Sequence, residues 1–186
     1  MPSSLLGDAV LGLSQDWPRE RFDKVFDEAV AYEPLYRANY YQKAQYLLPK
    51  WHGEEGEWEK FAVQSADQLG GVDGSTTLYF IFDAIIDNYE DKDQPAILTP
   101  VWGRLKQGFA DTDKTYTVMW SMVNTYARYA YFVGDRAEAR KAFDRIGTHW
   151  NENVWNSKAK FDKAKAWASI EEPLPANHET PLRSLP

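Results

Sequence analysis

Apolar side chains recur at every third or fourth position along most of this chain, and that spacing restricts the fold more than any other feature of the sequence. Residues spaced in this way lie on one face of an α-helix, whereas a half-buried strand would alternate between apolar and polar residues. Ile97, Val101, Leu105 and Phe109, for example, follow one another at intervals of four. No segment sustains strict alternation, so the sequence predicts an all-α chain.

Glycine and proline residues divide this pattern into segments of helical length. Pro34 and Pro49 end the first two segments, because proline disfavours the helical conformation of the residue before it. Gly70 and Gly147 are suited to the left-handed conformation that often follows a helix C-terminus. We therefore expect about seven or eight helices. The predicted segments are residues 18–32, 35–48, 57–69, 75–89, 95–109, 113–133, 136–146 and 157–169.

The helical pattern predicts one domain that spans residues 18–170. A chain of 186 residues has the usual size of a single domain and buries enough surface to fold without a metal ion or a disulfide. Residues 1–17 are then an N-terminal extension. Residues 171–186 contain four prolines, which favours an extended or disordered tail.

Two segments reproduce the order of small, aromatic and turn residues in the tetratricopeptide repeat. They are Phe22, Phe26, Ala29 and Pro34 in the first, and Ala127, Gly134, Ala139 and Phe143 in the second. In such repeats the small residues let two helices approach closely, and the aromatic residue fills the gap between hairpins. Phe22 departs from the pattern, since alanine is usual there. The resemblance implies antiparallel helical hairpins stacked as a short α-solenoid.

A second resemblance covers residues 22–155. Its most specific part is the segment Tyr46-Leu47-Leu48-Pro49-Lys50-Trp51-His52-Gly53, followed later by residues 124–128 and 134–136, then by Phe143 and Trp150. Together these are similar to an uncharacterised bacterial family of tetratricopeptide-like domains. That family has a helical-repeat fold and no assigned activity, so the resemblance supports the fold and leaves the function open.

Charge and composition argue against several classes of partner. The chain carries 28 acidic and 21 basic residues, which gives a formal net charge of −7. Nucleic-acid-binding proteins usually concentrate basic residues on one surface, and the densest basic stretch here, residues 136–145, is interrupted by acidic residues. Anionic membrane surfaces are disfavoured for the same reason. The absence of cysteine excludes disulfides, thiolate catalysis and cysteine metal sites.

The apolar runs are too short to cross a membrane. The longest is residues 78–82, whereas a transmembrane helix needs about 20 apolar residues. No lysine or arginine precedes Arg19, so the N-terminus lacks the charged start of a secretory signal. These features favour a soluble protein, with the cytoplasm as the default compartment and the oligomeric state left open.

Polar side chains form a stripe along the sixth predicted helix. They are Ser121, Asn124, Arg128 and Tyr131. In tetratricopeptide stacks the first helix of each hairpin lines a concave groove, so the resemblance implies that this stripe contacts a bound peptide. Asn124 and Arg128 lie one turn apart, and an arginine can bind both oxygens of a carboxylate. The matching positions in the second predicted helix are Tyr41 and Gln45.

The first functional hypothesis is therefore an interaction or scaffolding module that binds a peptide segment of a partner protein in this groove. The alternative for the same side chains is that they face solvent or bond to neighbouring loops. Another hypothesis is a self-assembling structural unit, because the end faces of a short helical stack need covering.

A small-ligand-binding protein or an enzyme, with a pocket of buried aromatic and acidic side chains, is the remaining hypothesis. Asp83, Asp87 and Glu90 share one face of the fourth predicted helix, and paired carboxylates can bind a divalent cation or act in acid–base chemistry. The alternative is a solvated helix face. The three histidines have no metal-binding or catalytic spacing, and no phosphate-binding glycine loop occurs. We assign no catalytic residue, no metal site and no cofactor from the sequence.

Overall fold

The computed structural model describes residues 17–170, and this part of the chain is helical, without a β-strand. The helices are α2 (Arg19–Tyr32), α3 (Arg37–Tyr46), α4 (Glu57–Leu69), α5 (Gly71–Ile85), α6 (Gln94–Leu98), α7 (Trp102–Thr115), α8 (Trp120–Phe132), α9 (Arg136–Ile146), α10 (Glu152–Trp155) and α11 (Lys158–Ser169), with 3₁₀ turns at Ile86–Asn88 (η1) and Thr99–Val101 (η2). The predicted all-α class is confirmed for these residues. Nearly all of the predicted extension and the whole of the predicted tail lie outside them.

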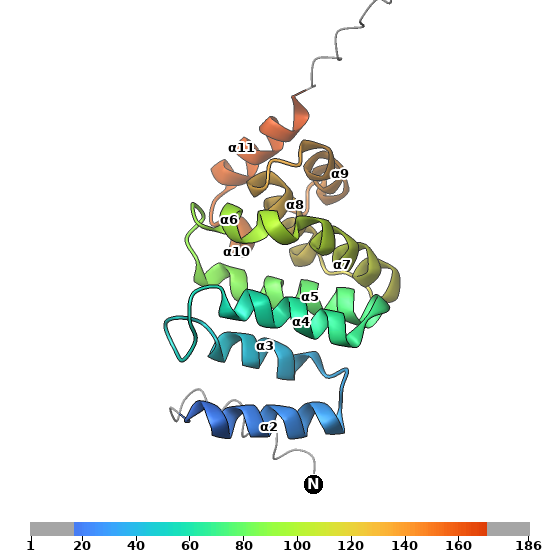
Figure 1. The fold of residues 1–186 in the computed structure, drawn as a ribbon. Coiled ribbons are helices and arrows are strands. Elements are labelled where there is room, and N and C mark those ends of the chain that lie inside the picture. Colours follow the sequence, from blue (N-terminus) through green and yellow to red (C-terminus); the bar gives the residue numbers. More distant parts are fainter. Residues whose placement is uncertain (1–16, 171–186) are drawn as a thin grey trace, which may run out of the picture.

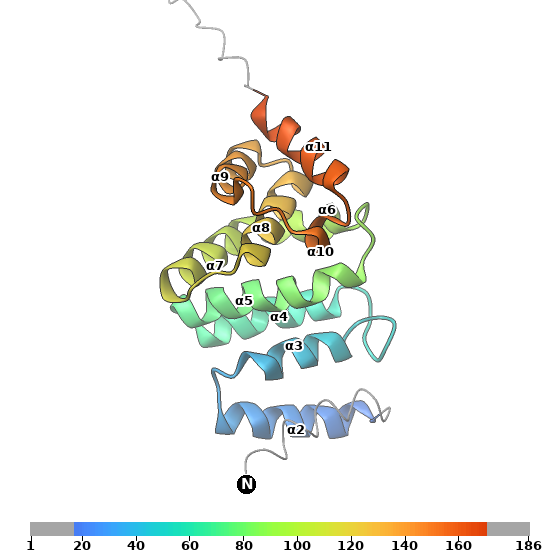
Figure 2. The same cartoon turned by 180° about the vertical axis from the view of Figure 1, so that it is seen from behind.

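The helices follow one another along the molecule in chain order, from α2 at one end to α11 at the other (Figure 1). Each packs mainly against helices close to it in the chain, and the most extensive contacts join α5 to α7, α8 to α9 and α4 to α5. The view from behind shows the same order (Figure 2). The consequence is an elongated molecule, with α5 near its centre.

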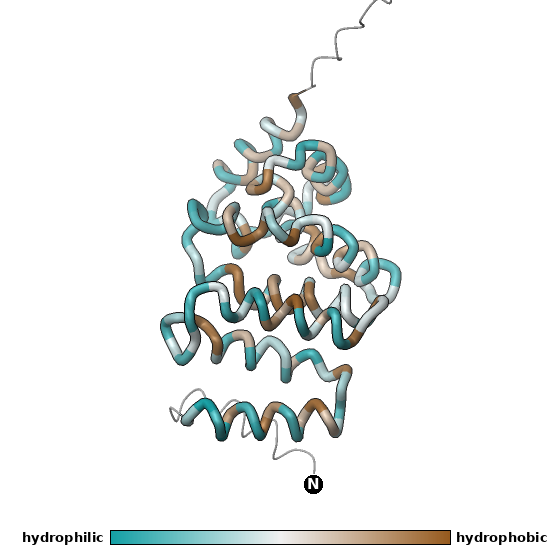
Figure 3. The backbone as a smooth tube through the Cα atoms, viewed as in Figure 1, coloured by the Kyte–Doolittle hydropathy of each residue, from teal (hydrophilic) through white to brown (hydrophobic). Residues whose placement is uncertain are grey.

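Aromatic side chains fill much of the space between the helices. Trp58, Tyr79 and Tyr129 are fully buried, and Phe143, one of the residues that match the repeat pattern, is also buried. Phe26 is partly buried and packs edge-on against Phe61. Hydrophobic residues recur along each helix between hydrophilic ones, as the apolar spacing predicts (Figure 3). None of the helices among residues 17–170 is long and apolar enough to span a bilayer.

Two glycines allow α5 to approach its neighbours closely. A Cβ atom on Gly74 would lie 2.2 Å from the Ala66 carbonyl oxygen in α4. A Cβ atom on Gly108 in α7 would lie 2.4 Å from the Ser75 carbonyl oxygen in α5. Carbon and oxygen atoms that are not bonded do not approach this closely, so any side chain here would separate the helices.

The predicted helix at residues 113–133 is wrong at its start. In the structure α7 continues to Thr115, residues 116–119 are not helical, and α8 begins at Trp120. Aromatic and β-branched residues, which have low helix propensity, occupy positions 116–118 of this connection. The apolar spacing of the predicted helix at residues 113–133 predicts that Tyr116, Met119 and Trp120 are buried. In the structure all three are among the exposed large hydrophobic residues.

Other elements also differ from the prediction. α5 begins at Gly71 and ends at Ile85, four residues before each end of the predicted helix at residues 75–89. The predicted helix at residues 95–109 is divided into α6, η2 and the first part of α7. Pro100 lies in η2 and has no N–H group to continue the α-helical bonding pattern. The short helix α10 was not predicted. Asn151 precedes it and accepts a hydrogen bond from the Val154 amide, which begins the helix.

Candidate functional site

A small cleft lies where α8, α10 and α11 meet the connection after α5. It has a volume of about 200 Å³, and we call it the Arg128 cleft. It is lined by Asp91, Arg128, Tyr131, Phe132, Val154, Trp155, Asn156, Lys160 and Lys163. The lining combines apolar walls with three cationic side chains and one carboxylate, a combination suited to a ligand that is part apolar and part anionic.

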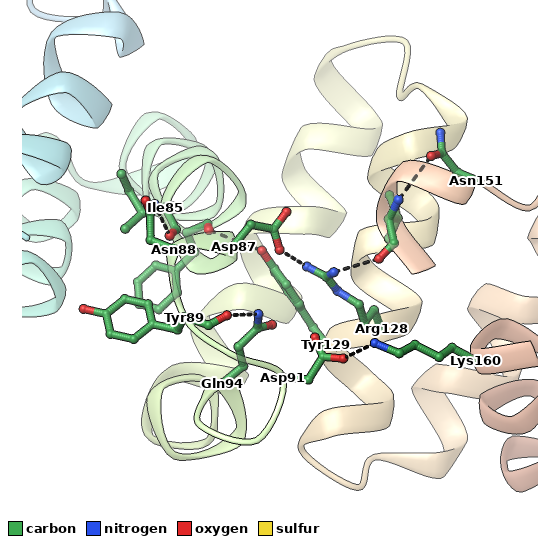
Figure 4. A network of polar contacts seen from close by, with 12 residues as sticks. Ile85, Asp87, Asn88, Tyr89, Asp91, Gln94, Arg128, Tyr129, Asn151 and Lys160 are labelled. Atoms are coloured by element: carbon green, nitrogen blue, oxygen red, sulfur yellow. Dashed lines mark hydrogen bonds and ion pairs between the residues drawn. The ribbon is translucent and has the colours of Figure 1, made fainter. Parts of the chain in front are cut away.

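Arg128 lies almost completely within the protein, with 5% of its surface exposed. Its Nη1 donates to the Val154 carbonyl oxygen at 2.7 Å, and its Nη2 pairs with the Asp87 carboxylate. Figure 4 shows the guanidinium group between Asp87 on one side and α10 on the other. The Nε atom is buried and has no hydrogen-bond partner in the described part of the chain. A buried donor without an acceptor is unfavourable, so an acceptor oxygen at Nε would be stabilising.

Two lysines of α11 also line the cleft. The Lys160 ammonium group pairs with Asp91 at 2.7 Å (Figure 4), while Lys163 is exposed. With Arg128 these lysines contribute three positive charges against the one negative charge of Asp91, so the lining carries a formal charge of +2. The neighbouring Asp87 lowers the local total to +1. The lining of the cleft is therefore positively charged on a protein whose net charge is −7, with Asp83 and Asp87 as counter-charges to Arg128.

Asn124 is completely buried and bonds four groups, rather than lining the cleft. Its side-chain amide donates to the Trp120 and His149 carbonyl oxygens at 2.8 and 2.9 Å. Its side-chain oxygen accepts from the Asn151 amide at 3.2 Å and from the Trp155 indole N–H at 3.0 Å. Asn124 thus holds the segment that contains α10 against α8. α10 in turn forms one wall of the cleft.

The remaining predicted groove residues do not gather in one place. Tyr131 lines the Arg128 cleft, whereas Ser121 is half-buried at the start of α8. Tyr41, which is exposed, and Gln45, which is half-buried, belong to α3. This helix packs on α4 and α5, far from α8 in the chain order of Figure 1. The structure therefore brings together Arg128 and Tyr131, with Asn124 beneath them, and leaves the α3 residues elsewhere.

Asp83 is shielded from solvent, whereas a solvated helix face was the alternative for the acidic residues of this helix. Burial raises its pKa to about 6, and the nearby Asp87 charge adds to the effect. A hydrogen bond from Thr125 and the positive charge of Arg128 act in the opposite direction. Asp83 therefore lies against α8, and its protonation state changes just below neutral pH.

Replacing Asp83 with asparagine is expected to stabilise the protein by about 2 kcal/mol near pH 8. The pKa of Asp83 in the folded protein is raised above the ordinary value of 3.8. Below pH 3.8 the side chain is protonated and the wild type keeps its full stability. As the pH rises through about 6, Asp83 ionises at a buried site and the wild type loses stability. Chemical denaturation across this pH range should show that the difference in unfolding free energy between variant and wild type disappears at about pH 4. Asp27→Asn on an exposed face of α2 should change stability by less than about 0.5 kcal/mol. A stabilisation by Asp83→Asn that is constant with pH would contradict the assignment.

A wider groove lies between α7, α8 and α9, with a volume of about 550 Å³. Four of its five charged residues pair with one another: Arg145 binds Asp113 through two hydrogen bonds of 2.7 Å, and Lys141 pairs with Glu138. The fifth, Lys106, pairs with Asp135. These pairs leave less charge available for a ligand than the Arg128 cleft does. Residues 17–170 contain no group of three or more histidine, aspartate or glutamate side chains placed to hold a metal ion.

Comparisons with protein-family models, with curated proteins and with solved structures each found no match to this chain. The chemistry of its own residues is therefore the guide to function. In the described part of the chain, the Arg128 cleft combines a buried donor without an acceptor, an excess of positive charge and apolar walls.

Proposed function

We propose that this protein is a tetratricopeptide-like interaction module that binds the carboxylate end of a peptide or protein partner in the Arg128 cleft. Helices that pack against their neighbours in the chain support a short solenoid of helical hairpins. In α8 and α9, Ala127 and Ala139 are fully buried, and Gly134 adopts a positive φ of 77° at the turn between them. This is the role that the repeat pattern gives to small and turn residues.

The observation that carries the binding proposal is Arg128, which lines the cleft and whose buried Nε atom has no acceptor in the described part of the chain. A carboxylate oxygen would supply that acceptor and would also place negative charge near Lys160 and Lys163. The two Nη atoms are already bonded to Val154 and Asp87. The expected contact is therefore a single bond from Nε, rather than the two-oxygen arginine contact that the sequence predicted.

The size of the cleft restricts the ligand. Sites for drug-sized molecules have volumes of about 300–1,000 Å³, and this cleft has about 200 Å³. It fits the last residue of a peptide, with the carboxylate near Arg128 and the side chain against Phe132 and Trp155. A nucleotide or a larger cofactor exceeds this volume.

Short peptides that end in leucine test the proposal, with either a free carboxylate or an amidated terminus. We expect calorimetric titration to detect the free acid and to show at least about tenfold weaker binding of the amide, since amidation removes the charge that the cleft recognises. Lys163→Glu should weaken binding about fivefold, because it replaces an attraction with a repulsion at a partly exposed site.

Lys24→Glu is the matched control, because it makes the same change in net charge on an exposed residue of α2. It should leave the affinity unchanged. Acetate and inorganic phosphate, titrated separately, distinguish recognition of a peptide end from binding of any small anion. Equal affinity for the acid and the amide, or no binding of either peptide, would overturn the proposal.

A further inference from the structure

A second groove lies at the opposite end of the molecule, between α2, α3 and α4 (Figure 1). It has a volume of about 460 Å³, which is within the usual range for a small-molecule site. We call it the Lys43 groove. Its lining contains three acidic residues (Asp23, Asp27 and Glu57) and three basic residues (Arg19, Lys43 and Lys60), so it is neutral overall.

Lys43 is unusual among the lysines because only 7% of its side chain is exposed. Its ammonium nitrogen lies 5.2, 5.7 and 5.5 Å from the ring centres of Phe22, Phe26 and Tyr46. The Asp23 carboxylate pairs with the same nitrogen. A lysine amine held among aromatic rings, with a carboxylate beside it and a groove in front of it, is arranged as in enzymes that use lysine as a nucleophile.

Burial and the Arg19 charge favour the reactive neutral amine, whereas the paired Asp23 carboxylate and the aromatic rings favour the ammonium form. Burial lowers the pKa of Lys43 to about 8, and the Arg19 charge adds to this effect while Glu57 opposes it. The other charged groups that line the groove are Asp23 and Asp27 from α2 and Lys60 from α4. Arg19 is itself paired with Glu57, which holds both side chains beside the groove.

We propose that Lys43 condenses with the carbonyl carbon of an aldehyde that binds in this groove. The ammonium group passes a proton to Asp23, and the neutral amine attacks the carbonyl carbon to give a carbinolamine. Asp23 returns the proton to the hydroxyl group, which leaves as water. One ammonium group and one aldehyde thus give one protonated imine and one water, Asp23 ends ionised as it began, and no oxidant or reductant is needed.

The groove also indicates the kind of aldehyde. Because its acidic and basic side chains balance, it offers no preference for a charged substrate. Phe26, Leu47 and Phe61 form the apolar part of a lining that is otherwise polar, and this part can hold the aromatic ring of an aldehyde. This site is separate from the Arg128 cleft, and neither proposal depends on the other.

Reductive trapping tests the proposal. The complete protein is incubated with benzaldehyde and sodium cyanoborohydride at about pH 8. Benzylation of each lysine is followed by peptide mass spectrometry. We expect Lys43 to be modified at least about tenfold faster than Lys24, which is exposed outside the groove, and Lys60, which is exposed at its edge. Modification of Lys43 should already be half-maximal near pH 8.

Lys43→Arg keeps the positive charge and removes the nucleophile. In this variant the fast-reacting position should disappear, while Lys24 and Lys60 are modified at their wild-type rates. Circular dichroism confirms that the variant is folded. Modification of Lys43 at the rate of Lys24 or more slowly would overturn the proposal, as would a fast-reacting lysine elsewhere that persists in Lys43→Arg.

Discussion

Replacing Asn124 with leucine is expected to destabilise the protein by about 4 kcal/mol, the largest effect that we predict. Leucine fills a similar volume and forms none of the four hydrogen bonds of the asparagine side chain. The indole N–H of Trp155 and the amide of Asn151 would remain without an acceptor next to α10. Each buried polar group left unpaired costs about 1–3 kcal/mol. Three of the four groups that bond to Asn124 lie outside α8, namely the His149 carbonyl, the Asn151 amide and the Trp155 indole N–H. Chemical denaturation followed by circular dichroism measures the loss.

Ser121→Ala is the control for this variant, because Ser121 lies one turn earlier in α8 and is half-buried. Its effect should stay within about 0.5 kcal/mol. Peptide binding in the Arg128 cleft should also weaken in Asn124→Leu under conditions in which the variant is still folded, because α10 loses its attachment to α8. A loss of stability below about 1 kcal/mol would show that the hydrogen bonds of Asn124 are readily replaced by water.

Gly108→Ala is expected to cost about 3 kcal/mol, which is at the upper end of the usual range for overpacking. The new methyl group would lie 2.4 Å from the Ser75 carbonyl oxygen and 2.9 Å from the Tyr79 Cβ atom. Both atoms belong to α5 and neither can rotate away, so α7 must move from its most extensive contact. Thermal denaturation should show a lower midpoint.

Gly103 offers a matched substitution in the same helix. No atom lies within 4 Å of the position where its Cβ would be, so Gly103→Ala has no steric conflict. Alanine favours the helix over glycine by up to about 1 kcal/mol, and this variant should be neutral or slightly more stable. If both variants behaved alike, helix propensity rather than the contact between α5 and α7 would explain the result.

The sequence predicted most of the helices because their apolar residues face a core on one side. α9 is an example, since Ala139, Ala142, Phe143 and Ile146 are all buried as expected. The prediction was wrong where local preference and apolar spacing disagree. Tyr116 and Met119 continue the spacing of α8, but the low helix propensity of residues 116–118 separates α7 from α8.

The candidate site was predictable only in part. Asn124 and Arg128 do lie on one face of a helix, as their spacing predicts, and both contact the segment of α10. That segment has only four residues in helical form, too few for any periodic pattern to reveal. The sequence therefore predicted an open groove at the place where α10 covers Asn124.

Buried charged and polar residues were the other feature that the sequence did not show. α5 contacts α3, α4 and α7, and residues of α8 also bond to it, so Asp83 is shielded from solvent. Asp87 and Glu90 on the same face are exposed, as expected for a solvated helix face. In α3, Asn39, Gln42 and Lys43 are all buried, and the helix has no clear apolar stripe. Polar residues usually indicate a solvent-exposed face, and only the positions of neighbouring helices reveal the exceptions.

The order of helix packing has a consequence for how the chain folds. Since α3, α4, α5, α7, α8 and α9 contact partners that are close in sequence, native pairing closes only short loops and loses little chain entropy. Proteins with such local contacts fold quickly. The polypeptide can therefore pair its helices progressively while it is being synthesised, before the residues that form α11 have been added.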